Sequence, residues 1–227
     1  MNPPLKCKFL CIIDGNLDLF TFTPIMTTNR LEAFSDGVFA IAATLLVLNI
    51  KFPELPGESN SQLNHLLIAA LPNVLTFIFT FLVVGIFWTA HHRFFAMVKK
   101  VDQFLLWSNN FYLMLIALIP FPASLLAKHP LLNTAIIFYS SILFLCGLQH
   151  IILLLYLYKH TALLSKNAVL ISFHSALKIA FVGPGCYLLA ILASFITPFL
   201  SFFFIIVPLI FYIFLAPRLL KIKPDNL

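Results

Sequence analysis

Long apolar segments recur along the chain and are separated by short polar stretches. Each is long enough for a transmembrane helix, which needs roughly 20 predominantly apolar residues. A continuous apolar segment of this length predicts a helix, because strands are much shorter. The six segments are residues 31–50, 66–98, 103–126, 131–158, 168–196 and 199–216. The pattern therefore predicts an all-α membrane protein with six transmembrane helices per subunit.

The composition supports this class. Hydrophobic residues make up 61% of the 227 positions and charged residues 10%, whereas a soluble domain carries roughly 25% charged residues. The four cysteines have no metal-binding spacing, so we expect neither a metal site nor a disulfide framework. No nucleophile stands beside a positioned base, so we do not expect an enzyme. The cysteines are Cys7, Cys11, Cys146 and Cys186.

The chain divides into three parts. Residues 1–29 mix polar and apolar positions and contain three prolines; their apolar run is too short for a signal peptide. We expect a poorly ordered N-terminal extension there, with Met26 as an alternative start. A six-helix transmembrane domain is expected at residues 30–217, and a short basic tail at 218–227.

Basic residues predict the orientation. With six spans both termini lie on one side of the membrane, and cytoplasmic loops carry the excess of Lys and Arg. The side with the termini carries eleven basic residues and the other side only Lys51 and Lys128. We therefore expect cytoplasmic termini, and the net charge of +6 needs no nucleic acid. The eleven are Lys6, Lys8, Arg30, Arg93, Lys99, Lys100, Lys159, Lys166, Arg218, Lys221 and Lys223.

A charged cluster runs directly into the first apolar segment. Arg30, Ser35 and Asp36 precede an uninterrupted apolar run. An ionised side chain at membrane depth costs about 2.5 kcal/mol or more unless it is paired or hydrated. This cluster is therefore a candidate functional feature.

Helical phase divides the first segment into two faces. At 100° per residue, one stripe holds large apolar side chains and a single threonine. The opposite face holds Asp36 with small residues, and we expect it to pack against another helix of the same subunit. The stripe can face lipid, or a symmetry axis where it would form a hydrophobic constriction. The stripe consists of Phe34, Gly37, Ile41, Thr44, Leu45 and Leu48, and the small face of Asp36, Ala40, Ala43 and Val47.

Polar residues of the first three segments share one depth. At about 1.5 Å per residue, they lie roughly 9–12 Å from the cytoplasmic end. We expect a structural network that clamps these helices together; a proton or metal site is the alternative. Gln149 is expected to bond a neighbouring helix, and Pro184 between two glycines to kink the fifth span. The expected network contains Arg30, Phe34, Ser35, Asp36, His91, His92, Trp107 and Asn109.

Several of these strings resemble one family. Arg30-x-x-x-Phe34-Ser35-Asp36 at the start of the first of six helices resembles the signature of the transmembrane protein 175 family, the lysosomal potassium channels of animals and their prokaryotic relatives. The resemblance covers about residues 27–217. Similar strings are Trp88-Thr89-Ala90-His91-His92-Arg93, Leu106-Trp107-Ser108-Asn109 and Ile119-Pro120-Phe121-Pro122.

The resemblance implies a potassium-selective channel without a cofactor, with K⁺ as the permeant ion. A single six-helix repeat implies a homotetramer in a prokaryotic inner membrane, with the first helix lining a central pore. Ile41 would form the gate, Leu45 and Leu48 further apolar rings, and Thr44 a selectivity position. The carbonyl filter sequence of ordinary potassium channels is absent. The expectation that the permeant ion is potassium therefore depends on the resemblance. A secondary transporter, whose helices are often broken near the midplane, is the alternative.

Overall fold

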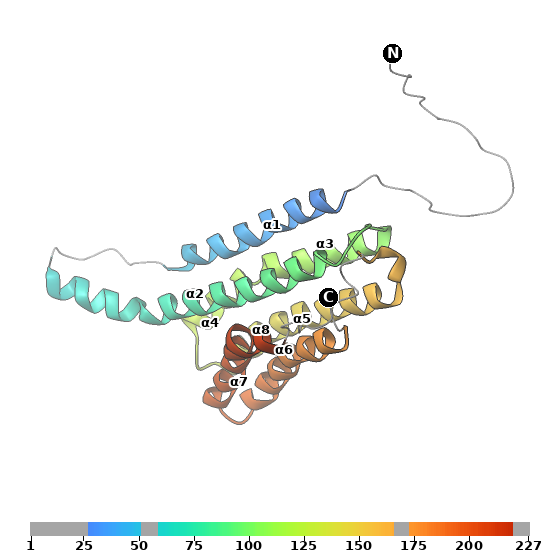
Figure 1. Ribbon diagram of the computed structural model, residues 1–227. Helices are drawn as coiled ribbons and strands as arrows, with labels where there is room; N and C mark the ends of the chain where they lie inside the picture. The colour runs from blue at the N-terminus through green and yellow to red at the C-terminus, as the bar shows by residue number, and fades with distance from the viewer. Residues whose placement is uncertain (1–26, 51–58, 166–172, 220–227) are drawn as a thin grey trace, which may run out of the picture.

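The computed structural model describes residues 27–50, 59–165 and 173–219, and the described segments are helical (Figure 1). Six helical stretches are long and apolar enough to cross a membrane, which confirms the predicted all-α membrane class. Most of the expected extension and tail lies outside the described residues. The elements are α1 (Thr28–Leu45), η1 (Leu46–Asn49), α2 (Asn60–Phe95), α3 (Gln103–Leu118), α4 (Pro120–Lys128), α5 (Asn133–Lys159), η2 (Thr161–Leu163), α6 (Phe173–Ser194), α7 (Pro198–Ile210), η4 (Phe211–Leu215) and α8 (Ala216–Leu219).

The helices form a bundle with α5 near its centre. α5 packs on α3, α4 and α6, and 61% of its apolar window is buried within the subunit. α1 packs on α2 and α3 at one face of the bundle, and α6 and α7 lie at the opposite face (Figure 1). Only 28% of the α1 window is buried. The subunit therefore leaves much of its first helix available to lipid or to other copies.

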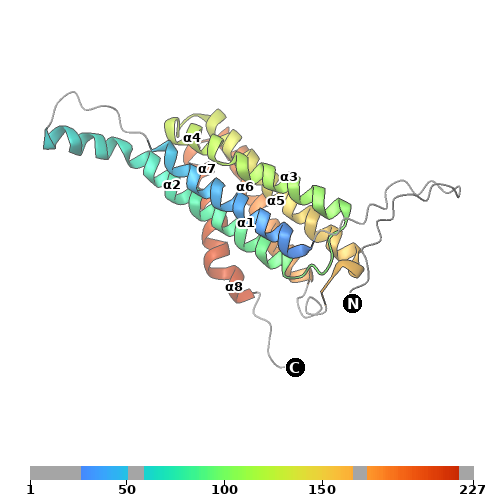
Figure 2. The ribbon, with the colours of Figure 1, turned by 90° about the horizontal axis from the view of Figure 1, so that it is seen from above.

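α2 is longer than the membrane is thick. Its 36 residues span about 54 Å, whereas the hydrocarbon core is about 30 Å thick. It begins at Asn60, six residues before the predicted start, and its first turns protrude beyond the other helices (Figure 2).

Two spans are divided into shorter helical segments near a proline. Pro120 begins α4 directly after α3, so the third span is two helices. Pro208 precedes the π-helical turn η4 in the sixth span. Both breaks follow from the missing N–H of proline, which removes a helical hydrogen bond.

A tyrosine side chain from the sixth span forms hydrogen bonds with two backbone groups of α6. The Gly183 N–H donates to the Tyr212 hydroxyl at 3.0 Å, and that hydroxyl donates to the Ile179 carbonyl at 3.0 Å. Gly183 and Ile179 are the donor and acceptor of one i→i−4 helical bond, and a side chain inserted there is a recognised cause of helix bending. The inserted hydroxyl lies one residue before Pro184, where the sequence predicts a kink.

α5 and α6 approach each other at Gly147. A Cβ atom placed on Gly147 would lie 2.5 Å from Cγ of Pro184. The proline ring is rigid and cannot move aside cheaply. Gly147 therefore permits the close contact between these two helices.

Gly147→Ala is expected to destabilise the protein by about 1–3 kcal/mol, the usual cost of overpacking a close contact. The measurement is the free energy of unfolding of the purified protein in detergent. Gly185→Ala is the matched control, because a Cβ there has no neighbour within 4 Å. Equal stability of the two variants would contradict the close α5–α6 contact.

Two polar loops meet at one end of the bundle. The Lys99 N–H donates to the Leu163 carbonyl at 2.7 Å, and the Ser165 N–H donates to the Met97 carbonyl at 2.8 Å. The Thr28 hydroxyl at the start of α1 lies 3.5 Å from the Lys99 carbonyl. This end therefore holds the start of α1 together with Lys99 and its loop.

Candidate functional site

α1 buries one face against α2 and α3. The buried residues recur every three or four positions, so they form one helical face. Most of them have larger side chains than the small residues that were expected to pack, and one of them carries a hydroxyl group. The buried residues are Leu31, Ser35, Phe39, Ala42 and, in η1, Leu46.

The stripe singled out by helical phase is exposed on the subunit. Ile41 is 60% exposed and Leu48 is 65% exposed, and Phe34 and Leu45 are also exposed. Leu48 lies in the 3₁₀ segment η1, where side chains three positions apart eclipse each other. Leu45 and Leu48 therefore lie nearly in line, and the stripe continues to the end of the span.

Thr44 is the polar member of this stripe. Its hydroxyl lies 2.9 Å from the Ala40 carbonyl and 3.0 Å from the Ile41 carbonyl, and it donates to this pair within its own helix. A hydroxyl that donates its proton to its own helix retains lone pairs that can accept a bond or meet a cation. The side chain is exposed, so these lone pairs are accessible.

The small face of α1 does not pack as predicted. Asp36, Ala40 and Val47 are exposed and Ala43 is half-buried, so the expectation that this face packs within the subunit is wrong. Instead, three of these residues border an open cavity beside α2. The reason is that large residues on the neighbouring face fill the space between α1, α2 and α3.

A buried hydrogen-bonded clamp joins α1, α3 and α2. Asn109 Nδ2 donates to Ser35 Oγ at 3.2 Å, and Ser35 Oγ donates to the Leu31 carbonyl at 2.8 Å. His91 Nε2 lies 2.8 Å from Asn109 Oδ1, and it donates because the amide oxygen can only accept. All three polar side chains are at most 1% exposed. Asn109 thus connects the first helix to the second.

A second polar cluster joins α1 and α2 on the exposed side of the clamp. The Trp88 indole N–H donates to an Asp36 carboxylate oxygen at 2.9 Å. The His92 ring stacks on Trp88 with centroids 5.9 Å apart. Trp88 was in a motif string but not among the predicted network residues. Its indole donor and its position one turn before His92 were the signals that could have found it.

Three expected network residues lie outside both clusters. Within the described part of the chain, Arg30 and Trp107 make no side-chain hydrogen bond or ion pair, and Phe34 is exposed. Phe34 lies on the exposed stripe, and Trp107 is rotated about 200° from Asn109 around α3. Ser35, His91 and Asn109 of the expected network do meet. Rotation around each helix separates the other three residues from the clamp within one subunit.

The clamp continues to the fourth span. Gln149 Nε2 donates to the Ser108 carbonyl at 3.0 Å and to its hydroxyl at 2.8 Å. This confirms the prediction that Gln149 bonds a neighbouring helix. Within the described residues the adjacent His150 Nδ1 has no partner, and its ring lies 6.1 Å from that of Tyr112.

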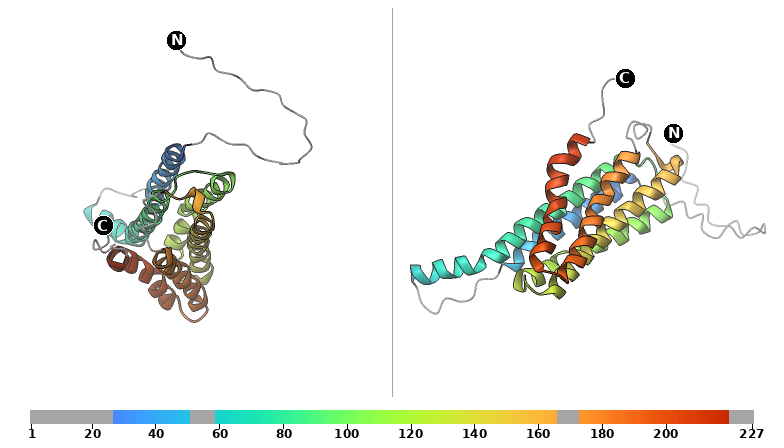
Figure 3. Two further views of the ribbon diagram at one scale, coloured as in Figure 1. Left: turned by 45° about the vertical axis from the view of Figure 1, so that its right-hand side comes forward. Right: turned by 90° about the horizontal axis from the view of Figure 1, so that it is seen from below.

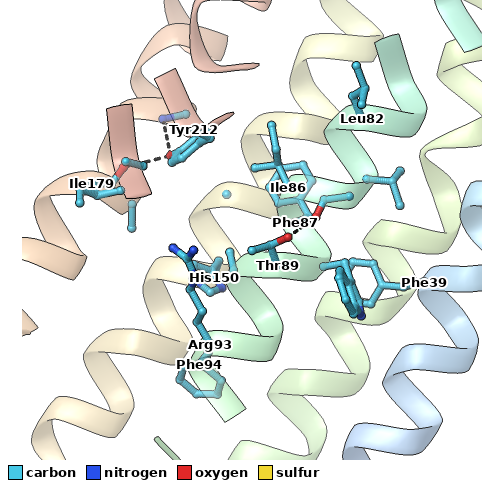
Figure 4. Close-up of a pocket in the computed structure, with 18 of the residues that line it drawn as sticks. Phe39, Leu82, Ile86, Phe87, Thr89, Arg93, Phe94, His150, Ile179 and Tyr212 are labelled. Carbon is cyan, nitrogen blue, oxygen red and sulfur yellow. Dashed lines mark hydrogen bonds between the residues drawn. The ribbon is translucent and has the colours of Figure 1, made fainter. Parts of the chain in front are cut away.

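A cavity of about 1190 Å³ opens along α2. Figure 4 shows α2 between Phe39 of α1 on one side and Ile179 and Tyr212 on the other. Apolar side chains make up most of the lining, and Arg93 and His150 also border it. The cavity is therefore a predominantly apolar groove bordered by α1, α2, α5 and α6.

The family model described as "Endosomal/lysosomal potassium channel TMEM175" matches residues 30–120. This range includes the exposed stripe and both polar clusters. The chain is 39% identical over 181 residues to a potassium channel of Chamaesiphon minutus, covering 77% of this chain and 87% of that protein. It is 35% identical to a potassium channel of a Chryseobacterium species, covering 83% and 94%.

The chain also resembles animal proteins and solved structures. It is 31% identical to the endosomal/lysosomal proton channel TMEM175 of Gallus gallus, covering 80% of this chain but 37% of that protein. The crystal structure of a lysosomal potassium-selective channel TMEM175 homolog from Chamaesiphon minutus matches with a TM-score of 0.71 at 32% identity, covering 83% and 97%. The potassium channel MtTMEM175 matches with a TM-score of 0.55 at 21% identity, which supports the fold.

Proposed function

The chain belongs to the TMEM175 family of potassium channels, and we propose that it conducts K⁺ passively through a pore lined by its first helix. The family is one of ion channels, so the protein is not an enzyme. The proposal is carried by one observation: α1 holds a continuous exposed stripe of large apolar side chains beside a rigid polar clamp. A clamp of this kind fixes the rotation of α1 and thereby the direction of the stripe.

The stripe suits a hydrophobic constriction. Rings of apolar side chains around an axis gate a pore by excluding water. An ion cannot pass a dry ring, because the apolar side chains do not replace the water of its hydration shell. Ile41 is the proposed gate, and Leu45 and Leu48 form further rings toward the outer side. One helix cannot enclose a pore, so several copies must surround the axis.

We propose that the assembly is a homotetramer. The chain spans 87% and 94% of two bacterial potassium channels but 37% of the chicken protein. It therefore corresponds to the short, bacterial form of the family, for which a fourfold ring of single units is the expected arrangement. A repeated contact between identical subunits gives a ring where its rotation closes.

The proposed location is a prokaryotic inner membrane with both termini in the cytoplasm. Lys99, Lys100 and Lys159 lie near the same end of the bundle as the start of α1. The excess of Lys and Arg at that end supports the cytoplasmic assignment.

The decisive experiment is a current measurement on the purified protein in planar bilayers. A channel gives a potassium current that grows with voltage and concentration at rates far above transporter turnover. Saturable flux coupled to a second solute would favour the secondary transporter, the alternative that the Gly183-Pro184-Gly185 segment left open. Absence of any current from correctly assembled protein would refute the proposal.

Thr44→Val is expected to lower the K⁺/Na⁺ permeability ratio at least threefold. Valine preserves the shape of threonine but removes the hydroxyl lone pairs that face the proposed pore. The readout is the reversal potential under bi-ionic K⁺/Na⁺ conditions. Thr76→Val is the control, because Thr76 also donates to its own helix but lies on α2. An unchanged ratio in Thr44→Val would exclude this hydroxyl from selectivity.

A further inference from the structure

α3 and α4 carry an exposed ridge of large side chains. Its six residues are between 40% and 62% exposed and follow one another at alternating spacings of three and four. This spacing is the 3.5-residue repeat of helices that pack along a common seam. The α3 ridge consists of Phe104, Trp107, Phe111, Met114, Leu118 and Phe121.

The groove along α2 has the opposite shape. Where it borders α1 and α2 it includes small residues, with Ala40 and Ala43 on the α1 side and Gly85 on α2. A Cβ atom placed on Gly85 would have no neighbour within 4 Å. Small residues allow a neighbouring helix to approach closely in a membrane. We call this cavity the α2 groove.

The ridge and the groove lie on the two sides of the proposed pore helix. α1 packs on both α2 and α3 (Figure 3, left). The α2 groove reaches the small face of α1, and the ridge belongs to the helix on its other flank. A rotation about an axis in front of α1 would therefore bring the ridge of one copy toward the groove of the next.

We infer that the α3 ridge of one subunit seats in the α2 groove of a second copy of this chain. The contact is heterologous, because two different surfaces meet, and a heterologous contact whose rotation closes generates a ring. The inference rests on the proposed function, since closure of this ring places the Ile41 stripes around the axis. It also assigns a role to Trp107, which lies in a motif string but is 62% exposed on the single subunit.

Shape and area favour a second copy over lipid. Lipid tails cover apolar surface as well as protein does, so association in a membrane depends on packing. Six large side chains with roughly half of 150–250 Å² exposed offer on the order of 500 Å². That is a large part of the roughly 800 Å² per partner of a standard interface, and the α1 stripe and small face add to it.

Depth along the two helices matches. Trp107 and Phe111 lie about 6 and 12 Å from the cytoplasmic start of α3, and Thr89 and Gly85 about 9 and 15 Å from the cytoplasmic end of α2. The ridge residues thus face groove residues within about one helical turn. These pairs define a cross-linking test.

The test uses full-length protein with its four native cysteines replaced by alanine. Phe111→Cys and Gly85→Cys subunits carry tags of different size and are expressed together and oxidised. A disulfide between the two tags is expected, and a double-cysteine subunit should give a ladder up to four subunits. Trp107→Cys with Thr89→Cys is a second pair, and Phe111→Cys with Leu188→Cys is the control. No cross-link in either pair, or cross-links within single-cysteine preparations only, would overturn the inference.

Gly85→Phe gives an independent result. An added Cβ has no neighbour within 4 Å in its own subunit, so the larger side chain extends into the groove, and the subunit should keep its helical content while the assembled mass falls from four subunits toward one. Gly85→Ala should remain assembled. A fully assembled Gly85→Phe protein would overturn the inferred contact. Loss of bound lipid from that variant in native mass spectrometry, with the assembly intact, would show that lipid occupies the groove. Cross-linked rings without current would refute the proposed function alone, and current without cross-links would refute this interface alone.

Discussion

Ile41→Asn is expected to raise the potassium current at least tenfold. A tenfold increase corresponds to about 1.4 kcal/mol of barrier. Ile41 is the proposed narrowest ring and is 60% exposed on the subunit. Asparagine replaces a surface that repels water with an amide that can bond water and ions, and it does so at every copy around the axis. The expected result is a constriction that stays hydrated and conducts.

The measurement is single-channel current in planar bilayers, which separates conductance and open time from the amount of protein inserted. Leu188→Asn is the matched control, because Leu188 is an exposed leucine 15 residues after the start of α6, and Ile41 lies 13 residues after the start of α1. That variant introduces the same amide away from α1 and should leave the current unchanged. Equal effects of the two substitutions would mean that Ile41 faces lipid, which is the alternative that helical phase left open.

The spans were predictable because membrane helices must satisfy every backbone group internally. That requirement makes each one a long apolar segment, and six such segments were visible in the sequence. Breaks at Pro120 and Pro208 follow from the same chemistry. The exposed stripe of α1 was also predictable, because the helical repeat alone places Ile41, Thr44 and Leu45 on one side.

The packed face of α1 was not predictable. In a soluble protein the polar face is the outer one, but in a membrane both faces of a helix are apolar. The rule that small residues mark a packed face pointed to Ala40 and Ala43, whereas Phe39 and Leu46 are the residues buried within the subunit. In the inferred interface, the small face packs against a second copy. The rule therefore applies to a contact that a single subunit does not contain.

The hydrogen-bond partners within the polar layer could not be predicted from the sequence either, for a different reason. Depth follows from counting residues, but pairing depends on how neighbouring helices are rotated relative to one another. Asn109 faces Ser35 and His91, whereas Trp107, two residues earlier, faces away. The same limit applies to Tyr212, whose hydroxyl bridges two backbone groups of a helix 29 and 33 positions earlier.

Asn109→Leu is expected to destabilise the protein by about 2–4 kcal/mol. The substitution removes both bonds of the amide and leaves His91 Nε2 buried without a partner, and an unsatisfied buried donor costs about 1–3 kcal/mol on its own. Ser35 retains its bond to the Leu31 carbonyl, so most of the loss falls on His91. The measurement is the free energy of unfolding in detergent, followed by potassium current at matched protein amounts.

Asn110→Leu provides the control at the next position. Within the described residues Asn110 Oδ1 is buried without a hydrogen-bond partner, so replacing it with an apolar side chain removes no bond and should be neutral or stabilising. Because the clamp fixes the rotation of α1, Asn109→Leu should also make the current heterogeneous in amplitude, while Asn110→Leu should not. A stable Asn109→Leu protein with uniform wild-type currents would mean that apolar packing of Leu31, Phe39 and Leu46 alone orients the stripe.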